Sequence, residues 1–499
     1  MTGLPSPSRA APGAVTAEAR QASRAAMFIL ALTVFRLMWL ARAPYPLYGD
    51  EAQYWTWAQA LDWGYVSKPP LIAWLIGITT SLVGDNEFGV RVASPICHAV
   101  TALMIAELGR RLYDARTGAW SGVLYASLPA VSVSAMLIST DVPLMLFWTM
   151  GVLFLKRALD PGGQRWWIGV GVALGLGLLS KYAMAMFVPS AGLYLALAPE
   201  HRAVLRTRWP WMALALGLAI YAPNLIWNVA HGGLTYLHTG ANAHLGGDLF
   251  HPAKLGEFVG SQFGVFGPLL FAVLLFLLVA RLGRLQRDPR SWLLAAFALP
   301  QLLLIAIEAL LSRAHANWAA TAYVTATVLV VAWCRARRRL WLVLPVSLGL
   351  HVAALAVMVD YHDLARLAGV ELTRATDPFH RLRGWNFLGS AVSAQLAQHP
   401  GFVLMTDDRM LFAEMAFYVR PRPTQVAWNW QDHPTDQYEL TTDIAAVGDR
   451  PILYLTENLD PRDVLARFRE ADPVARITIP LYPGVARRYA LFALQGFKG

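Results

Sequence analysis

Residues 27–71 read MFILALTVFRLMWLARAPYPLYGDEAQYWTWAQALDWGYVSKPPL. An apolar run at 27–42 is followed by an acidic pair, Asp50 and Glu51, then by a tryptophan-rich stretch and a Lys-Pro-Pro turn that begins at Lys68. Ionisable groups beside a bilayer are costly to desolvate, so acidic and basic residues this close to a membrane boundary indicate a site for a charged substrate. Charged loop residues are also often merely solvated, and the local sequence leaves that alternative open.

The composition is that of a membrane protein. Of 499 residues, 56% are hydrophobic and 15% are charged, whereas ordinary soluble domains carry roughly 25% charged residues. Apolar runs close to the length of a hydrocarbon core predict about eleven transmembrane helices. They lie near residues 27–42, 91–109, 117–138, 142–157, 166–180, 182–198, 209–228, 264–280, 291–311, 316–334 and 340–359. The shorter apolar stretch 70–83 predicts a helix that lies along or dips into the interface.

The net charge of +10 arises from short basic tracts between the spans. With a cytoplasmic N-terminus, the tracts at 110–116, 156–165, 202–208, 281–290 and 335–339 all fall on the cytoplasmic side. Because Lys and Arg mark the cytoplasmic loops of membrane proteins, this bias predicts the orientation and places the Asp50 loop outside the cytoplasm. Basic residues dispersed in this way do not form a single face, so we expect no nucleic-acid partner.

The chain divides into three parts. Residues 1–26 are basic and rich in Ala, Pro and Ser, which predicts a disordered cytoplasmic segment. Residues 27–359 form the membrane domain, and the motif at Ala41 to Ala43 leaves signal-peptide cleavage open. After residue 360, short apolar runs and turns predict an α/β domain on the same side as the Asp50 loop. Its expected helices are 387–399 and 460–471, and its expected strands are 401–406, 416–419, 425–428, 451–456, 476–481 and 488–494.

The chain lacks the sequence patterns of several common kinds of site. The polar outer loop 229–261 is expected to cover a cavity, and its histidines are spaced seven, six and seven residues apart. That spacing does not put two ligands on one helical face, which argues against a metal cluster. The cysteines, Cys97 and Cys334, lie in predicted spans, so we expect no disulfide. The chain lacks Walker and dinucleotide-binding glycine patterns, which argues against an ATP-driven pump.

The predicted topology gathers charged residues of both signs at the outer membrane face. They are Asp50, Glu51, Lys68, Asp141, Lys181, Arg313 and His315, together with the loop histidines His231, His238, His244 and His251. Asp141 opens a span, so its carboxylate could instead only cap that helix. Residues 51–61 would place Tyr54 and Trp57 on one face of an interfacial helix, where we expect them to anchor the helix in the membrane.

These motifs resemble the GT-C class of integral-membrane glycosyltransferases, which use lipid-linked sugars, and in particular the bacterial aminoarabinose transferases and protein O-mannosyltransferase-like enzymes (families 39 and 83). The resemblance covers roughly residues 27–335. It rests on motifs shared with the class, which are Asp50-Glu51, Gly64-Tyr65, Lys68-Pro69-Pro70, Arg91, Asp141, Ser180-Lys181-Tyr182 and His315-Ala316-Asn317-Trp318. A GT-C fold is therefore expected, followed by a small soluble domain.

The resemblance implies a mechanism and a set of residues for it. The catalytic carboxylates would be Asp50, Glu51 and Asp141, with Asp50 orienting or deprotonating the acceptor hydroxyl. The phosphate-binding residues would be Lys68, Arg91 and Lys181, and the loop or acceptor contacts would be His315, Asn317 and Tyr65. Where the aminoarabinose transferases have a glutamate before the loop lysine, this chain has Ser67. A divalent metal is left open, with no ligand set.

The expected partners are a polyprenyl-phosphate-linked sugar, membrane lipids, and an envelope acceptor such as lipid A or another glycolipid. The expected location is the bacterial inner membrane, with the active site facing the periplasm. Protein O-glycosylation is the alternative within the enzyme class. A transporter or flippase of polyprenyl-linked lipids, and a non-catalytic assembly subunit, are alternatives from other classes. The sequence shows no pair of broken helices in two related halves, which argues against the transporter.

Overall fold

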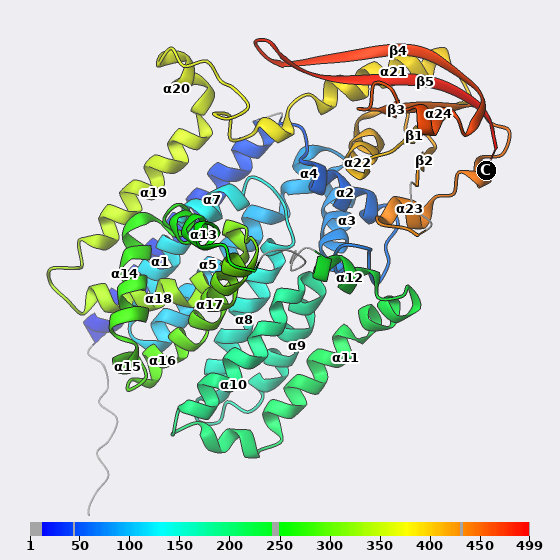
Figure 1. Cartoon of the computed structure of the whole chain (residues 1–499). Helices are drawn as coiled ribbons and strands as arrows, with labels where there is room; N and C mark the ends of the chain where they lie inside the picture. The colour runs from blue at the N-terminus through cyan, green and yellow to red at the C-terminus, as the bar shows by residue number, and fades with distance from the viewer. Residues whose placement is uncertain (1–11, 43–44, 242–248, 430–432, 499) are drawn as a thin grey trace, which may run out of the picture.

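The computed structural model describes residues 12–42, 45–241, 249–429 and 433–498. It contains a large helical part, which ends with α20 (Tyr361–Leu367), and a smaller part with a sheet, which begins with α21 (Trp385–Gln398) (Figure 1). The first helix, α1, runs over Pro12–Arg42. The boundary predicted at residue 26 therefore lies inside a helix, and the disorder predicted for 12–26 is wrong. Residues 1–11 lie outside the described residues.

The helical part packs around one buried apolar cluster that joins α1 to the later helices. These helices are α5 (Ala93–Leu112), α6 (Ala115–Ser127), α7 (Pro129–Ser134), α8 (Asp141–Leu159), α9 (Trp166–Ser180), α10 (Phe187–Leu197), α11 (Trp209–Ala230), α12 (Leu234–Ala241), α13 (Pro252–Val265), α14 (Pro268–Ala280), α15 (Leu282–Leu285), α16 (Pro289–Ala296), α17 (Leu299–Leu311), α18 (Ala322–Arg335) and α19 (Val343–Val359). Short 3-10 helices are η1 (Tyr182–Met186), η2 (Arg202–Arg206) and η3 (Ala316–Ala319). Every apolar run identified in the sequence falls on these helices.

Five helical stretches of the described chain are long and apolar enough to cross a membrane. They are Glu18–Arg42, Glu87–Leu112, Asp141–Leu159, Trp209–Ala230 and Pro289–Leu311. A sixth is formed if α19 and α20, which are bent by 80° at their junction, count as one span. Other apolar helices are only 10–17 residues long, and the predicted span 117–138 is interrupted before Pro129, whose ring disfavours a helical residue ahead of it. The multi-pass helical architecture is confirmed, and the number eleven stays a prediction.

The block after α1 forms three helices. They are α2 (Gly49–Ala58), α3 (Leu71–Val83) and α4 (Glu87–Arg91). At the start of α2 the Tyr48 backbone N–H donates to Glu51 Oε2 at 2.9 Å, which satisfies one of the free amide groups of the helix end. The helix α3 begins directly after Pro70, as the sequence predicts for 70–83.

The C-terminal part contains a five-stranded sheet in the order β2-β1-β3-β5-β4. Its strands are β1 (Val403–Thr406), β2 (Gln425–Ala427), β3 (Ile452–Thr456), β4 (Phe468–Tyr482) and β5 (Val485–Phe497). β1 pairs in parallel with β2 and β3, whereas β5 is antiparallel to β3 and β4. Alternate residues of β3 face opposite cores: Leu453 packs with α21, and Tyr454 packs in a second cluster. The predicted α/β class is confirmed.

Two local predictions in this part are wrong. Residues 416–419, expected as a strand, form the end of α22 (Arg409–Tyr418), whose Leu411 and Met415 repeat at helical spacing on its buried face. The expected helix 460–471 is only α24 (Arg462–Leu465), and β4 begins at Phe468. Short apolar runs do not distinguish a strand from one turn of buried helix, which explains both errors.

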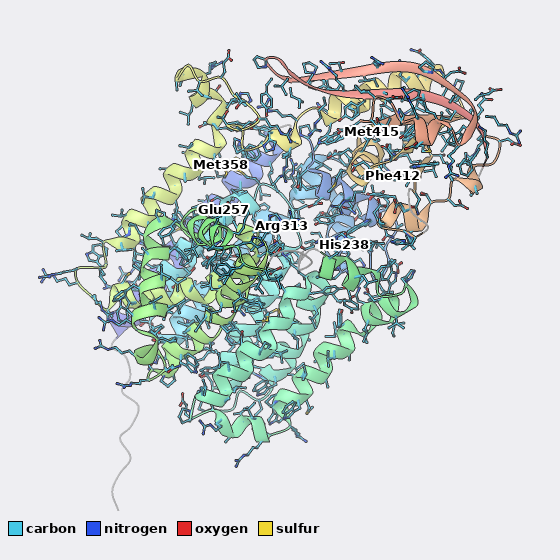
Figure 2. The ribbon with its side chains drawn as sticks, in the orientation of Figure 1. His238, Glu257, Arg313, Met358, Phe412 and Met415 are labelled. Carbon is cyan, nitrogen blue, oxygen red and sulfur yellow. The ribbon has the colours of Figure 1, made fainter. Side chains whose placement is uncertain are left out.

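The C-terminal domain packs directly on α2. The Thr56 and Tyr438 hydroxyls are 2.7 Å apart, where Tyr438 belongs to α23 (Gln437–Thr441). Phe412 of α22, labelled in Figure 2, lies in the same buried cluster as Tyr54 and Trp57. These two α2 aromatics are 3% and 2% exposed, so the prediction that they anchor α2 in the membrane is wrong. The sheet domain and the first loop therefore lie on the same side, as expected.

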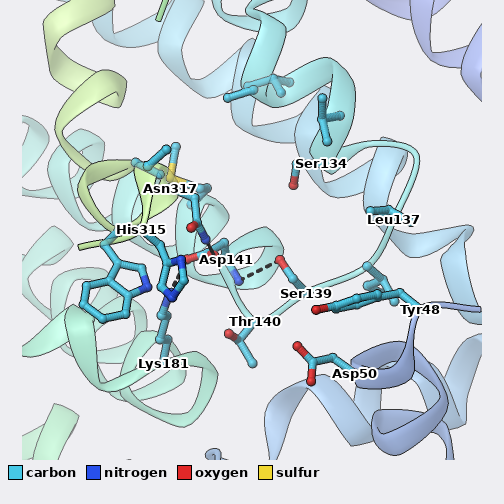
Figure 3. Close-up of a pocket in the computed structure, with 18 of the residues that line it drawn as sticks. Tyr48, Asp50, Ser134, Leu137, Ser139, Thr140, Asp141, Lys181, His315 and Asn317 are labelled. Carbon is cyan, nitrogen blue, oxygen red and sulfur yellow. Dashed lines mark hydrogen bonds and ion pairs between the residues drawn. The ribbon is translucent and has the colours of Figure 1, made fainter. Parts of the chain in front are cut away.

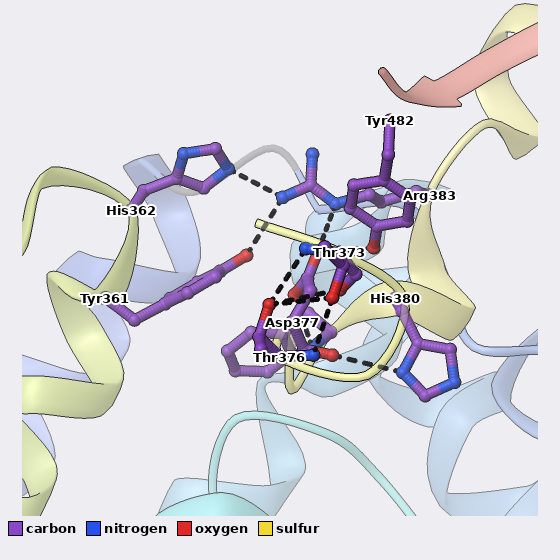
Figure 4. Close-up of polar contacts among 9 residues, drawn as sticks. Tyr361, His362, Thr373, Thr376, Asp377, His380, Arg383 and Tyr482 are labelled. Atoms are coloured by element: carbon purple, nitrogen blue, oxygen red, sulfur yellow. Dashed lines mark hydrogen bonds and ion pairs between the residues drawn. The ribbon is translucent and has the colours of Figure 1, made fainter. Parts of the chain in front are cut away.

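The segment between α20 and α21 is held by Asp377. The Phe379 backbone N–H donates to Asp377 Oδ1 at 2.8 Å, and the Tyr482 hydroxyl donates to Oδ2 at 2.7 Å. Arg383 forms an ion pair with the same carboxylate and also contacts His362 (Figure 4). This network fixes the short helix η4 (His380–Leu382) between the membrane part and the β4–β5 hairpin.

Candidate active site

A cavity of about 750 Å³ lies between the first-loop block, the start of α8, the segment before η3 and the C-terminal domain. It brings together residues that lie far apart in the sequence (Figure 3). The predicted site residues that line it are Asp50, Glu51, Lys68, Asp141, Lys181, His315 and Asn317. Two predicted residues, Arg91 and Tyr65, are not among the lining residues.

Asp50 occupies the first turn of α2, where the helix dipole favours a negative charge. Its carboxylate accepts no hydrogen bond and forms no ion pair with the side chains that the structure describes. Burial raises the pKa of the Asp50 carboxyl above its usual range, and the positive charges of Arg409 and Lys68 partly oppose the rise. A lining carboxylate without a protein partner is available to a ligand, and a raised pKa makes it a stronger base.

Lys68 lines the cavity from the turn that precedes α3. The turn is closed by a hydrogen bond of 3.2 Å from the Tyr65 backbone N–H to the Lys68 carbonyl. Within the described parts of the chain, the Lys68 ammonium has no hydrogen-bond or ion-pair partner. Burial lowers the pKa of Lys68, and the neighbouring charge of Lys181 lowers it further. The ammonium is therefore a desolvated cation that faces the cavity, as an anionic ligand requires.

Asp141 is held by side chains from two other elements. The Lys181 ammonium donates to Asp141 Oδ1 at 2.7 Å, and the Asn317 amide donates to Oδ2 at 2.8 Å (Figure 3). The backbone N–H of Asp141 itself lies 3.3 Å from the Ser139 hydroxyl. Because both carboxylate oxygens bond across the cavity wall, the alternative that Asp141 only caps α8 does not fit this geometry. The trio joins α8, the end of α9 and η3 at one point.

Glu51 and Arg91 have a different place from the one that the sequence predicts. Glu51 accepts four hydrogen bonds, from the Tyr48 and Ile138 backbone N–H groups and from two nitrogens of Arg91. Arg91 also donates to the Tyr45 and Pro46 carbonyls. Both Glu51 oxygens and four N–H groups of Arg91 are bonded within the wall, so this geometry does not support the catalytic role predicted for Glu51 or the phosphate contact predicted for Arg91. The pair joins the first loop to α4 and to the segment between α7 and α8.

The position of Tyr65 also differs from the one that the sequence predicts. Its ring stacks on Trp57 at 4.5 Å, its hydroxyl donates to the Trp57 carbonyl at 3.1 Å, and the side chain is 1% exposed. The predicted acceptor contact by Tyr65 is therefore wrong, because the residue is enclosed by the loop that it stabilises. His315 lines the cavity as expected, and burial lowers its pKa, so it is present there as a neutral imidazole near pH 7.

Several lining residues were not predicted from the sequence. Tyr48 precedes the acidic pair, Arg381 lies in η4, and Arg409 begins α22. His238, one of the loop histidines expected at this face, comes from α12. Burial and the neighbouring Lys68 lower the pKa of His238 to about 4. The position of His238 supports the expectation that the loop 229–261 covers a cavity. No local signal marks Arg381 or Arg409, since only the docking of the C-terminal domain brings them to Asp50.

The described residues contain no cluster of three His, Cys, Asp or Glu side chains that could hold a metal ion. Of the loop histidines, His244 lies outside the described residues. Asp141, an oxygen donor suited to a divalent cation, is already bonded to Lys181 and Asn317. The described residues therefore do not fit a resident metal.

Comparison with known proteins adds independent information. Residues 67–227 match a family model described as dolichyl-phosphate-mannose-protein mannosyltransferase. The lipid A galacturonosyltransferase RgtD of Rhizobium johnstonii is 32% identical over 445 residues, which is 86% of this chain and 90% of that protein. The undecaprenyl phosphate-alpha-4-amino-4-deoxy-L-arabinose arabinosyl transferase of Pseudomonas aeruginosa is 33% identical over 189 residues, 34% of each chain.

Solved structures share the fold. The structure is similar to that of ArnT from Cupriavidus metallidurans in the apo state, with a TM-score of 0.66, 17% identity, and coverage of 94% of this chain and 97% of that one. The same protein bound to undecaprenyl phosphate gives a TM-score of 0.61 at 17% identity and covers 97% and 98% of the two chains. At this identity the likeness establishes the fold, including the attached C-terminal domain.

Proposed function

This chain belongs to the GT-C class of integral-membrane glycosyltransferases, and we propose that it moves a sugar from a polyprenyl-phosphate donor onto an envelope glycolipid at the periplasmic face of the bacterial inner membrane. Lipid A is the first candidate acceptor, because RgtD, named a lipid A galacturonosyltransferase, matches most of both chains. The observation that carries the proposal is the pair of unpartnered charges, Asp50 and Lys68, in one cavity.

In the proposed reaction, Asp50 acts on the acceptor. An acceptor hydroxyl attacks the anomeric carbon of the donor sugar, a new glycosidic C–O bond forms, and the C–O bond to the phosphate breaks. Asp50 takes the hydroxyl proton, and its raised pKa brings its basicity closer to the working pH. A single carboxylate that faces the cavity without a protein partner is suited to that role.

The phosphate leaves with the bonding electron pair, so negative charge grows on it in the transition state. Lys68, a lining cation without an ion pair among the described residues, would stabilise this charge. Lys181 is shared with Asp141, so we assign the Asp141–Lys181–Asn317 trio to holding the phosphate and the acceptor in line. A fixed geometry of this kind converts binding into orientation, which is a large part of catalysis in group transfer.

The periplasmic location is part of the proposal. The basic tracts between the spans support it, since they lie at the ends of the helices opposite to the cavity residues in the predicted topology. The contact between α2 and α23 is consistent with a C-terminal domain on the same side as the first loop.

The test is to compare bacterial cells that contain and lack the gene. Mass spectrometry of lipid A should show one additional sugar mass only when the gene is present, and the Asp50→Asn variant at equal abundance should lack it. Purified enzyme should then transfer the same sugar from a polyprenyl-phosphate donor to isolated lipid A. Unchanged lipid A together with sugar-bearing envelope proteins would refute the glycolipid acceptor and favour protein O-glycosylation, the candidate that the family match at 67–227 supports.

A further inference from the structure

We propose that the transferred sugar carries a carboxylate, and that Arg409, with Arg381, is the side chain that binds it. The proposal rests on the polyprenyl-phosphate donor proposed above, and it names the class of sugar that this donor carries. Arg409 belongs to the C-terminal domain and Arg381 to the segment that leads into it, and both line the same cavity as Asp50. They would make the attached domain a determinant of sugar specificity.

The charges of the cavity carry the argument. Glu51 is neutralised by Arg91, which lies behind the wall, and Asp141 is neutralised by Lys181. Of the remaining lining groups, Asp50 is the unpaired anion, and Lys68, Arg381 and Arg409 are cations without an ion pair among the described residues. A donor phosphodiester brings one negative charge, which Lys68 can meet. The cavity then still has an excess of positive charge, from Arg381 and Arg409, which a second anionic group on the substrate would neutralise.

Arg409 is placed close to the reacting end of the cavity. It begins α22, and the adjacent Met410 packs against the start of α2: a Cβ added at Gly49 would lie 2.7 Å from the Met410 sulfur. Asp50 follows Gly49, and Arg409 precedes Met410. Both therefore line the cavity from neighbouring helix ends. Among the charges near Asp50, Arg409 has the largest effect, larger than that of Lys68.

This position fits the sugar better than the lipid part of the donor. Asp50 must lie beside the anomeric carbon to receive the acceptor proton, so a cation next to Asp50 lies within reach of substituents on the same ring. A hexuronic acid carries its carboxylate on C5, which one ring oxygen joins to the anomeric carbon. A planar guanidinium binds a carboxylate through two parallel hydrogen bonds, a contact with both strength and directional preference.

Arg381 is positioned by its surroundings. Its guanidinium donates to the Tyr48 hydroxyl at 3.1 Å, two residues before Asp50. Its helix η4 is fixed by the Asp377 network described above (Figure 4). Because Arg381 has a neutral partner, it keeps its full charge for a ligand. The two arginines reach the cavity from separate segments, one before α21 and one at α22.

Other sugars fit these charges less well. An amino sugar needs a free carboxylate, and the unpaired lining carboxylate is Asp50, which the reaction uses as its base. A neutral hexose would leave a buried positive excess uncompensated, which costs free energy. The other source of an anion is the acceptor, since glycolipid head groups often carry phosphate. The experiment separates these two sources.

The test uses the purified full-length enzyme with two donors that share one polyprenyl phosphate and differ only at C6, as a hexuronosyl and the matching hexosyl compound. Wild type should prefer the hexuronosyl donor in kcat/KM. Arg409→Gln should lower kcat/KM for the hexuronosyl donor at least about tenfold, which is the scale of one charge-assisted contact. The same variant should change kcat/KM for the hexosyl donor by no more than about twofold, within the spread of such measurements. Arg409→Lys, which keeps the charge but loses the second hydrogen bond, should fall between.

The matched control is Arg476→Gln, the same substitution at an exposed position of β4 outside the cavity, which should leave both values unchanged. Equal losses for both donors in Arg409→Gln, or a wild type without donor preference, would overturn the proposal. So would a loss that disappears when the acceptor is stripped of its phosphates, because the anion would then belong to the acceptor. A wild type that uses neither donor would refute the polyprenyl-phosphate reaction itself.

Discussion

The guanidinium of Arg91 and the carboxylate of Glu51 form a two-point ion pair, 2.6 Å between Nη2 and Oε2, inside the wall of the cavity. The side chains are 3% and 1% exposed. Each is also bonded to the backbone on either side, so the pair ties the segment before α2 to α4 and to the residues before α8. We expect the pair to affect the reaction only through the placement of its neighbour, Asp50.

Glu51→Gln should therefore damage stability more than chemistry. Removal of one partner from a buried ion pair leaves an uncompensated charge and costs about 3–5 kcal/mol. We expect a lower unfolding temperature in detergent micelles, with a much smaller loss of turnover for the fraction that stays folded. Glu107→Gln is the control, because Glu107 forms partly exposed ion pairs with Arg110 and Arg111, and such surface pairs are worth about 0–1 kcal/mol. A variant that unfolds like wild type yet has no turnover would restore the catalytic role that the sequence implied for Glu51.

The contrast between Asp50 and Glu51 shows how much of the site can be predicted from the sequence. Successive residues of a helix point about 100° apart, so the two adjacent acids direct their carboxylates differently: both line the cavity, but the Glu51 oxygens are bonded to Arg91. The sequence motif identifies the acidic pair, but only the packing of α4 shows which of the two carboxylates forms the ion pair with Arg91. Lys68, Asp141 and Lys181 were predictable, because the topology places each at the outer end of an apolar run. Arg381 and Arg409 were not, because they reach the site through docking of a domain whose contacts no local pattern encodes.

Cysteine labelling tests the predicted orientation. Ala60→Cys in the first loop and Ala397→Cys on α21 are at exposed positions, and both should react with a membrane-impermeant maleimide in intact spheroplasts. Gln286→Cys, exposed in the basic tract before α16, should react only after lysis. The native cysteines are 9% and 0% exposed, so their background labelling should be low. Protection of Ala60→Cys and Ala397→Cys until lysis would overturn the topology.

Removal of the Lys68 charge should affect the use of the donor. We expect Lys68→Ala to lower kcat at least about tenfold, because the leaving phosphate would lose its charge-assisted partner in a desolvated site. Lys68→Arg keeps the charge and should retain part of the activity. Steady-state kinetics with a varied donor measures both, and thermal unfolding shows whether Lys68→Ala is folded. Equal losses in the two variants, with donor binding unchanged, would argue against a contact between Lys68 and the phosphate.

Glu414 makes the stability of the C-terminal domain depend on pH. It lies on α22, it is 0% exposed, and neither carboxylate oxygen has a hydrogen-bond partner in the structure. Burial raises its pKa well above the usual range, so the folded state favours the protonated acid. The stability that protonated Glu414 contributes to the folded state is fully present below its unfolded-state pKa. That stability is lost as the pH rises through its folded-state pKa. Glu414→Gln, neutral at every pH, should therefore raise the unfolding temperature more at pH 8 than at pH 5. An equal shift at both values would show that Glu414 does not titrate on unfolding.

Asp50→Asn is the decisive substitution for the proposed chemistry. It keeps the size and much of the polarity of the side chain but removes the base, so transfer should slow at least about a hundredfold, the low end of a general-base contribution. Wild-type kcat should also fall in acid, beginning above the pH at which a free aspartate titrates, because burial raises the Asp50 pKa. Asp50→Asn should lack this acid limb, whereas Asp141→Asn should keep it and show a smaller loss, since Asp141 is already bonded to Lys181 and Asn317. Turnover of Asp50→Asn near the wild-type rate in a reconstituted assay would make Asp50 a structural loop carboxylate, and the transporter and assembly-subunit alternatives would then explain the cavity better.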